Sequence, residues 1–502
     1  MIRLFAILFI ILNFNKLDAQ ELEQGPVYSG DRKFTVLRLN GFYKGDIGVL
    51  KARTGKDELI KDIRIDLFDT SNLKHKSFAQ WNDCFAERTT FFPEGVMNFN
   101  DSLMLFGSAY NKDEQEMQLN VKGVFHTHEY ARIDSMGKVF SVKAAFSGFS
   151  GRRFRIVQEV QGKCLLMFYA GNPPDSDSLR LDFKVYDKNF KVVKEQHQIL
   201  PKLGVSFGLD EICVDESGNV FALLHWKSGG KKQQKSHYLY AFPSMLDEVV
   251  EYELTLDDYS TEEVRMHLAV NGKLWLAGLY FKNRKSDDAQ PEGVYLLSFD
   301  LNGSELKQST IRPFTQINYS GKDKQPQSLY GAGYLENLHL VELLESGDEM
   351  PLVVLEQQRR EEICQTDFRS NMLVCNQHYF ADALVLYQPH QNAQGDSCFV
   401  LDKKQHLVED EQVYLSSIAI ANPNGLPDFL CNANSTTSYG DLPLLENPET
   451  GNAIKLRIDG SAQYFPSDLP LHVTAGFAKS RNTFFFLGDG RAGNCIYRLR
   501  LQ

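Results

Sequence analysis

The sequence predicts an all-β protein with the architecture of a β-propeller. Short apolar runs alternate with turn-forming residues along the chain, which is the pattern of strands joined by tight turns. The runs come in groups of four at a period of about 55 to 60 residues, the size of a four-stranded propeller blade. No apolar pattern with the helical period extends beyond a few turns. Aromatic residues, which favour strands, make up 12% of the chain.

The repeated unit is clearest in residues 264–311. Its first strand alternates apolar and other side chains, as expected when one face is buried, and the apolar positions are Val264, Met266, Leu268 and Val270. Asn271-Gly272 follows and predicts a type I′ hairpin turn. The run Lys273–Phe281 is apolar almost throughout, which predicts a strand covered on both faces. A second turn at residues 300–303 leads into Glu305–Ile311, a run polar enough for the edge of a sheet.

The other units follow in order from their apolar runs. Three runs open the chain: Phe34–Asn40, Ile47–Arg53 and Asp62–Phe68. Later runs are 95–99, 103–110 and 117–124; 154–160, 164–169 and 179–186; 211–214, 220–226 and 237–242; 341–344, 352–356 and 383–387; 416–421 and 427–432; and 475–478, 483–487 and 495–501. The first hairpin turns fall near Asn100, Gln161, Ser217, Gly272, Gly347, Asn424 and Arg481.

These turns predict about seven four-stranded blades. Six blades result if one weak unit is not a blade, and eight if the N-terminal runs form a full blade. The last unit has three runs, so we expect the N-terminal region Phe34–Phe68 to supply its outer strand. N- and C-terminal strands would then close the ring and remove exposed sheet edges.

We expect one propeller domain over residues 20–502, with loop insertions near 313–334 and 357–380. Long loops on a rigid scaffold often carry binding residues, and plain surface decoration is the alternative. The candidate binding residues in these loops are Tyr319, Tyr330, Tyr334, Arg359, Arg360 and Arg369.

Residues 1–19 have the pattern of a secretory signal peptide. Arg3 supplies a positive start, Leu4–Leu12 is an apolar run too short for a permanent span, and Ala19 is a small residue before the cleavage point. An uncleaved anchor is the alternative. No later run is long enough to cross a membrane, so we expect an exported protein, periplasmic or extracellular.

Eight cysteines lie in the exported part. Eight cysteines allow 105 pairings, so the sequence alone does not fix a disulfide map. Cys364 and Cys375 flank one polar insertion, and we expect these two to form a disulfide. The others lie mostly in strand-like runs, where buried free thiols are expected.

The net charge limits the classes of partner that the protein is expected to bind. The formal net charge is −11, and an acidic surface does not favour nucleic acid as the main partner. We expect a monomer that binds a protein or glycan ligand.

Four motifs suggest chemistry, but their contexts favour structural roles. Gly204–Gly208 matches a nucleophile elbow, yet it leads into a strand. Gly488–Gly493 matches a dinucleotide fingerprint, yet no helix follows. His126 and His128 share one strand face without a recognisable third metal ligand.

The fourth motif starts at Asp215. The run Asp215-x-Ser217-Gly218-Asn219 resembles the start of a calcium loop but lacks the glutamate that completes one. We expect Asp215 and Asn219 to bond their own backbone, with a structural calcium ion as the alternative. The sequence therefore assigns no catalytic, cofactor-binding or metal residue.

The layout resembles that of secreted, uncharacterised multi-bladed β-propeller proteins of Gram-negative bacteria. The segments that carry the resemblance are the turns FDTSNL, YDKNFKVV and FDLNGSEL. The resemblance implies the fold and export, and it brings no catalytic residue with it.

The sequence favours a binding or scaffolding module over an enzyme. A carbohydrate-active hydrolase or lyase, with its site at the channel mouth, is the alternative, because paired carboxylates there would suit glycosidic chemistry. A structural subunit of an envelope complex is a third hypothesis.

Overall fold

The computed structural model describes most of the chain as antiparallel β-structure. It describes residues 22–500 except 31–32, 55–59, 82–84, 87–88, 100–101, 112–115, 124–130, 139–153, 159–162, 172–177, 202–205, 228–234, 246–247, 257–258, 270, 283–289, 301–305, 321–325, 329–334, 347–349, 368–371, 391–395, 409–416, 421–425, 433–436, 440–441, 445–450, 457–461, 468, 470, 481 and 491–492. These residues form strands and short 3₁₀ turns, and no α-helix lies among them. The predicted all-β class is confirmed.

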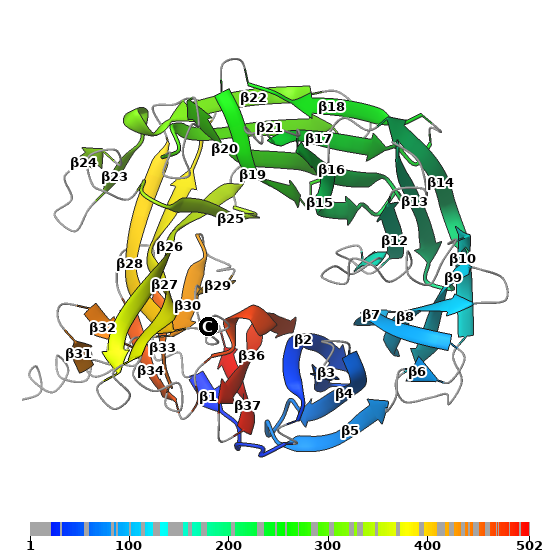
Figure 1. Cartoon of the computed structure of the whole chain (residues 1–502), viewed down its shortest axis with the longest axis horizontal. Coiled ribbons are helices and arrows are strands. Elements are labelled where there is room, and N and C mark those ends of the chain that lie inside the picture. The colour runs from blue at the N-terminus through cyan, green and yellow to red at the C-terminus, as the bar shows by residue number, and fades with distance from the viewer. Residues whose placement is uncertain are drawn as a thin grey trace, which may run out of the picture.

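The strands form eight sheets of four or five strands and two two-stranded ribbons within the described residues. Figure 1 shows the sheets following one another around a ring, which is the predicted β-propeller arrangement. In each sheet, strands that neighbour in sequence lie side by side and run antiparallel, with β1 and β33 as exceptions in sequence order.

The first four sheets occupy the N-terminal half. The first holds β2 (Thr35–Tyr43), β3 (Asp46–Thr54), β4 (Ile60–Asp69) and β5 (His75–Trp81). The second holds β6 (Phe85–Ala86), β7 (Thr89–Phe99), β8 (Ser102–Asn111), β9 (Glu116–Gly123) and β10 (Ala131–Lys138). The third holds β11 (Phe154–Gln158), β12 (Cys164–Gly171), β13 (Ser178–Asp187) and β14 (Val192–Pro201). The fourth holds β15 (Ser206–Val214), β16 (Val220–Lys227), β17 (Lys235–Phe242) and β18 (Val250–Leu254).

The other four sheets follow. The fifth holds β19 (Tyr259–Leu268), β20 (Lys273–Lys282), β21 (Gly293–Asp300) and β22 (Leu306–Pro313). The sixth holds β25 (Leu338–Leu344), β26 (Leu352–Asp367), β27 (Met372–Gln388) and β28 (Ser397–Val408). The seventh holds β29 (Ser417–Ile420), β30 (Asp428–Asn432), β33 (Gly451–Leu456) and β34 (Ala462–Ser467). The eighth holds β35 (Phe477–Ser480), β36 (Thr483–Gly490), β37 (Gly493–Arg500) and β1 (Leu22–Gln24).

Short elements lie between or beside these sheets. The two ribbons pair β23 (Asn318–Ser320) with β24 (Pro326–Ser328) and β31 (Thr437–Tyr439) with β32 (Leu442–Leu444). Two 3₁₀ turns are η1 (Phe314–Gln316) and η5 (Val473–Ala475).

Second strands are deeply buried where their pattern is described in full, as in β16, β20 and β30. β20 is exposed only at its two end residues, Lys273 and Lys282, which confirms the predicted strand covered on both faces. The first strands β15, β19 and β25 lie toward the centre of the ring, and β14, β18 and β22 lie at its outside (Figure 1). Side chains on the first strands are therefore placed to line the centre.

Neighbouring sheets are joined by shared apolar cores. The third and fourth sheets pack through Phe183 and Trp226, and the fifth and sixth pack through Trp275 and Val353, in each case within one larger cluster. The first and eighth sheets also share a core, which includes Val49 and Phe485. A single sheet cannot bury both its faces, so each sheet is stabilised by its neighbours.

The N-terminal segment joins the last sheet to the first. β1 pairs with β37 as the fourth strand of the eighth sheet, and Tyr28 bridges to Asn494 just beyond it. The prediction that Phe34–Phe68 supplies this strand is wrong, because those residues form β2 to β4 in a sheet of their own. Leu22–Gln24 supplies the strand instead.

Charged side chains are buried beside this junction. The Nζ of Lys51 lies 2.8 Å from Asp66 Oδ2 and also bonds Asn494 of the last sheet. The Nε of Arg64 donates to Asp66 Oδ1 at 2.7 Å, and its Nη2 donates to the Tyr28 hydroxyl at 2.7 Å. Asp66 thus compensates two buried cations that connect the first sheet, the N-terminal segment and the last sheet.

The second predicted insertion is largely regular structure rather than a loop. β26 and β27 pair from Val353–Tyr387 out to Asp367–Met372, so most of residues 357–380 form a long antiparallel hairpin. Cys364 and Cys375 face each other across it and are joined by a disulfide. Among the described residues Cys213, Cys398 and Cys431 are free thiols.

The turn after β19 also differs in detail from the prediction. Gly272 has a φ of +78°, but Asn271 is not among the residues with positive φ. A type I′ turn needs positive φ at both central residues, so this prediction is wrong. The N–H of Gly272 donates to Ala269 O, and that of Ala269 donates to Lys273 O. The hairpin forms with a single left-handed glycine.

We predict that Asp66→Ala lowers the free energy of unfolding by about 3–5 kcal/mol, because it leaves buried Lys51 and Arg64 without their carboxylate. Asp46→Ala is the matched control. Asp46 also pairs with a lysine at 2.8 Å, but that Lys76 is about half exposed and stays hydrated. The control should cost below about 1 kcal/mol. Urea titration of both variants measures the difference, and equal losses would contradict the prediction.

Candidate functional site

The first strands of three consecutive sheets are bulged at similar places. The register of β15 shifts between Leu209 and Glu211, which leaves Asp210 as the extra residue. The register of β19 shifts between Glu262 and Arg265, and that of β25 shifts between Leu340 and Glu342. Bulges re-aim side chains and free backbone groups, and they are common next to active sites.

Charged residues surround these bulges and form what we call the inner belt: Asp210, Glu211, Glu263, Arg265, His339 and Glu342. They come from β15, β19 and β25, the strands nearest the ring centre (Figure 1). The side chains of Arg265 and His339 are 40% and 44% exposed, so part of the belt is open to solvent.

Two belt glutamates tie each first strand to the next. Glu211 on β15 accepts the N–H of Met266 on β19 at 2.5 Å. Glu263 on β19 accepts the N–H of Leu340 on β25 at 2.8 Å. In both cases the carboxylate satisfies a backbone donor near the bulge of the neighbouring strand, which would otherwise be left unpaired.

Arg265 spans the same gaps in the other direction. Its Nε donates to Val341 O on β25 at 3.0 Å, and its Nη1 lies 3.4 Å from Glu211 Oε1 on β15. One guanidinium therefore contacts both flanking strands while remaining partly exposed.

Two belt carboxyls titrate above their ordinary range. Burial raises the pKa of Glu342 to about 6, and the charge of buried Glu356 adds to the rise while Arg265 opposes it. Burial also raises the pKa of Glu211, against the bond from Met266 and the charge of Arg265. A carboxyl that titrates near neutral pH can give or take a proton under physiological conditions.

His339 is shifted toward its charged form. Its Nδ1 lies 2.6 Å from Glu263 Oε1, and this hydrogen bond is the main reason that the pKa of His339 is raised. Desolvation opposes the rise. Burial lowers the pKa of His267 on β19, and the charge of Glu345 opposes this shift.

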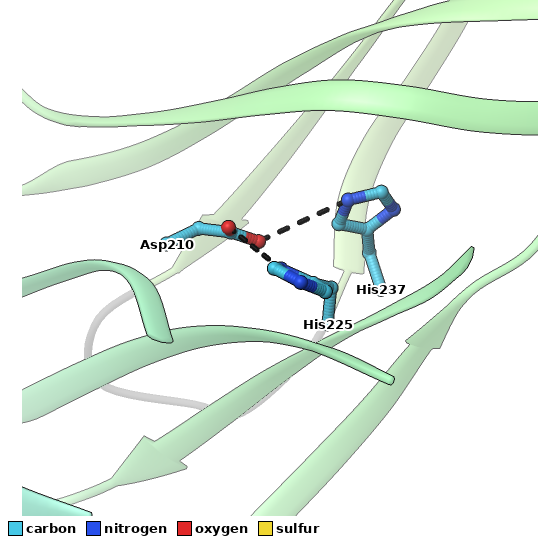
Figure 2. Close-up of side chains that lie close together, drawn as sticks. All are labelled: Asp210, His225 and His237. Atoms are coloured by element: carbon cyan, nitrogen blue, oxygen red, sulfur yellow. Dashed lines mark hydrogen bonds and ion pairs between the residues drawn. The ribbon is translucent and has the colours of Figure 1, made fainter. Parts of the chain in front are cut away.

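One end of the belt meets a cluster of three potential metal ligands. Asp210, His225 and His237 offer ligand atoms that all lie within 4.8 Å of one another. Figure 2 shows Asp210 between the two imidazoles. Its Oδ1 lies 2.7 Å from His225 Nδ1, and its Oδ2 lies 3.9 Å from His237 Nε2.

The sheet register creates this cluster. Gly208, His225 and His237 stand opposite one another on β15, β16 and β17, so they form one row across the sheet. A Cβ at Gly208 would lie 2.3 Å from His225 Cε1, so only glycine leaves room for that ring. His237 is 2% exposed, and burial lowers its pKa to about 4, so it is a neutral imidazole at neutral pH.

The predicted loop residues lie elsewhere or outside the described part of the chain. Arg359 and Arg360 lie on the long hairpin, where their guanidinium groups stack over Phe380 and Tyr379. Tyr319 lies in the ribbon strand β23. Tyr330, Tyr334 and Arg369 lie outside the described residues, as do His126 and His128. The structure does not join the described members into one site, and their binding role stays a prediction.

The motifs with structural explanations behave as expected where they are described. Ser206 and Gly208 are strand residues of β15, so no strand-to-helix elbow forms. Gly490 and Gly493 face each other across the β36–β37 hairpin. Asp215 accepts bonds from the N–H groups of Ser217 and Asn219, at 2.9 and 2.8 Å, within its turn. The predicted backbone bonding by Asp215 is confirmed, but the Asn219 side chain instead donates to the Asp215 carboxylate and accepts the N–H of Ser244.

The sequence analysis missed the cluster of Asp210, His225 and His237, although a signal was present. Runs 220–226 and 237–242 were predicted as successive strands of one unit. In an antiparallel pair the residue numbers of opposite positions have a constant sum, and His225 faces His237 on that basis. Asp210 approaches the two histidines because of the bulge in β15. No residue type in that strand predicts the bulge.

Comparison with known proteins extends only to the fold. No family model matches the chain. No curated protein matches it in sequence. Similar solved structures include the β-propeller domain of the trilobed protease from Pyrococcus furiosus, with 7% identity, 94% of each chain covered and a TM-score of 0.36.

Two polysaccharide lyases are also similar. An ulvan lyase of the PL25 family has 9% identity and a TM-score of 0.41, with 90% of this chain and 97% of that one covered. The lyase Uly1 has 10% identity and a TM-score of 0.39, with 97% and 98% covered. At this level of similarity, nothing about the activity of this chain follows from them. Within the described residues no helix has the length and apolar character needed to span a bilayer.

We predict that Glu263→Gln lowers the pKa of His339, because the amide loses the negative charge that favours the imidazolium. NMR titration of the histidine ring protons measures the change. His267 provides the internal control, since burial sets its pKa and its titration should not move. A His339 titration unchanged by Glu263→Gln would contradict the assignment of the raised pKa to this pair.

Proposed function

We propose that the chain is an exported binding module that holds a hydroxyl-rich ligand of the glycan class on the inner belt. The observation that supports this most is the set of partly exposed ionisable groups on three adjacent first strands. The pattern of a signal peptide in residues 1–19 supports export.

The chemistry of the belt suits such a ligand. Carboxylates such as those of Glu211 and Glu263 accept bonds from hydroxyl groups, and the guanidinium of Arg265 donates to ring and hydroxyl oxygens. Backbone bonds already fix the two glutamates, so their positions are set before a ligand arrives. A ligand that meets preorganised groups loses less entropy on binding.

A carbohydrate-active enzyme is the second candidate, and Glu342 is the observation that favours it. Burial raises the pKa of this carboxyl to about 6, within the range useful to a general acid or base. The belt also supplies other carboxylates from β15 and β19. A lyase or hydrolase at the ring centre would use Glu342 for proton transfer.

We predict that Arg265→Ala weakens the binding of a glycan found on an array by at least about tenfold, since a bond to a charged group contributes roughly 1.5–3 kcal/mol. Lys273→Ala is the control, because Lys273 is an exposed cation of the same sheet that lies four residues along β20 from Ala277, the register partner of Arg265. Binding curves for wild type and both variants measure the effect. Loss of binding in neither variant, or equally in both, would contradict the role of the belt.

For the enzyme alternative, we predict that Glu342→Gln abolishes product formation while the same glycan still binds. The amide cannot act as a general acid or base, but it keeps the shape of the carboxyl group. Chromatography of the incubated glycan detects products. If the wild type binds the glycan but never cleaves it, the enzyme hypothesis is wrong and the binding module remains as the function.

A further inference from the structure

The cluster of Asp210, His225 and His237 has the composition of a transition-metal site. Two imidazoles and one carboxylate are the ligands found on zinc and on non-haem iron. Calcium and magnesium prefer oxygen ligands throughout, so two histidines disfavour them. We propose that these three residues bind one divalent transition-metal ion, with Zn²⁺ as the representative ion.

The distances allow one ion to reach all three side chains. Zinc lies about 2.0–2.2 Å from nitrogen and oxygen ligands, so the ligand atoms of a tetrahedral site stand roughly 3.3–3.5 Å apart. Asp210 Oδ1 and His225 Nδ1 are closer than this, at 2.7 Å, and Asp210 Oδ2 and His237 Nε2 are slightly farther, at 3.9 Å. A site for one ion therefore requires rotations of these side chains that lengthen the first separation and shorten the second.

The residues around the cluster position its side chains but leave a carboxylate oxygen of Asp210 without a hydrogen bond in the described part of the chain. Within the described residues, Asp210 Oδ2 is buried and accepts no hydrogen bond, which is costly for a carboxylate oxygen. His237 Nδ1 lies 3.4 Å from the Thr261 hydroxyl of the next sheet. That contact directs its Nε2 toward Asp210 (Figure 2). Thr261 thus acts as the outer partner that ligating histidines usually have.

A comparison within the molecule shows what distinguishes this cluster. Asp182 and His197 on the preceding sheet form a similar pair, with Oδ1 and Nδ1 2.8 Å apart. There the other ring nitrogen of His197 lies 3.0 Å from Glu195, so the two carboxylates lie on opposite sides of the imidazole. In the Asp210 cluster the carboxylate instead lies close to two imidazoles, those of His225 and His237.

Metal binding would change one hydrogen bond. In the present geometry the proton between His225 Nδ1 and Asp210 Oδ1 is shared in a hydrogen bond. The metal requires Nδ1 without its proton, so the neutral tautomer protonated at Nε2 is the one that binds. Three protein ligands leave a fourth position for water or a ligand oxygen.

This position would extend the inner belt. Asp210 precedes Glu211 in the chain, so an ion at Asp210 would place a positive charge beside the carboxylates of the belt. The metal proposal does not depend on the glycan proposal, since Asp210 is the one residue that the ligand set shares with the inner belt.

The test is isothermal titration of Zn²⁺ into the full, untagged protein after removal of metal with a chelator. The variants are His225→Gln and Asp210→Asn, and the matched control is His197→Gln. We expect one tight equivalent in the wild type and the control. Each cluster variant should lose about 100-fold or more in affinity at that site, because even outer partners of metal ligands change affinity 10–100-fold.

Spectroscopy with Co²⁺ gives a second, independent readout. Bound Co²⁺ should give the visible absorption of a low-coordinate site in the wild type and not in His225→Gln. Thermal unfolding without metal shows whether each variant is folded, and the two partly exposed positions are chosen for this reason. A wild type that takes up no tight equivalent, or variants that bind Zn²⁺ as well as the wild type does, would overturn the proposal.

Discussion

The structure depends on apolar packing between successive sheets. β20 is a strand covered on both faces, and a lone sheet offers nothing to cover such a strand. The shared cores supply the cover from the neighbours on either side. The first and eighth sheets share a core as well, and the N-terminal segment packs at this junction through Tyr28. It adds the outer strand of the last sheet and directs Tyr28 toward the buried charges of the first.

The same packing explains why the candidate site lies at the inner strands. First strands contact those of neighbouring sheets at their bulges, where regular pairing fails and backbone donors are freed. Glu211 and Glu263 take up two of these donors, and Arg265 takes up a carbonyl. Structural need and exposed charge therefore coincide in the inner belt. The cluster at Asp210 arises from the same irregularity, because the bulge turns this aspartate toward the histidine row.

The sequence predicted the fold well because its signals are local. Alternation in β19 and the apolar run of β20 report burial directly. The strand that completes the last sheet was misplaced, since Leu22–Gln24 is too short to be recognised and its partner β37 is at the other end of the chain. The type of the Asn271-Gly272 turn also escaped prediction, because Asn-Gly is compatible with several hairpin geometries. The inner belt could not be predicted, since Glu211, Glu263 and His339 come together only through sheet order and bulges.

Residues 22–28 hold the first and last sheets together through the β1–β37 pairing and the Tyr28 hydroxyl. Amide hydrogen exchange of the chain that lacks these residues tests this role most directly. The account predicts faster exchange in β36, β37, β2 and β3, while β20 and β21, which lie across the ring from the segment (Figure 1), keep their protection. Unchanged protection of β37 and β3 in the shortened chain would contradict it.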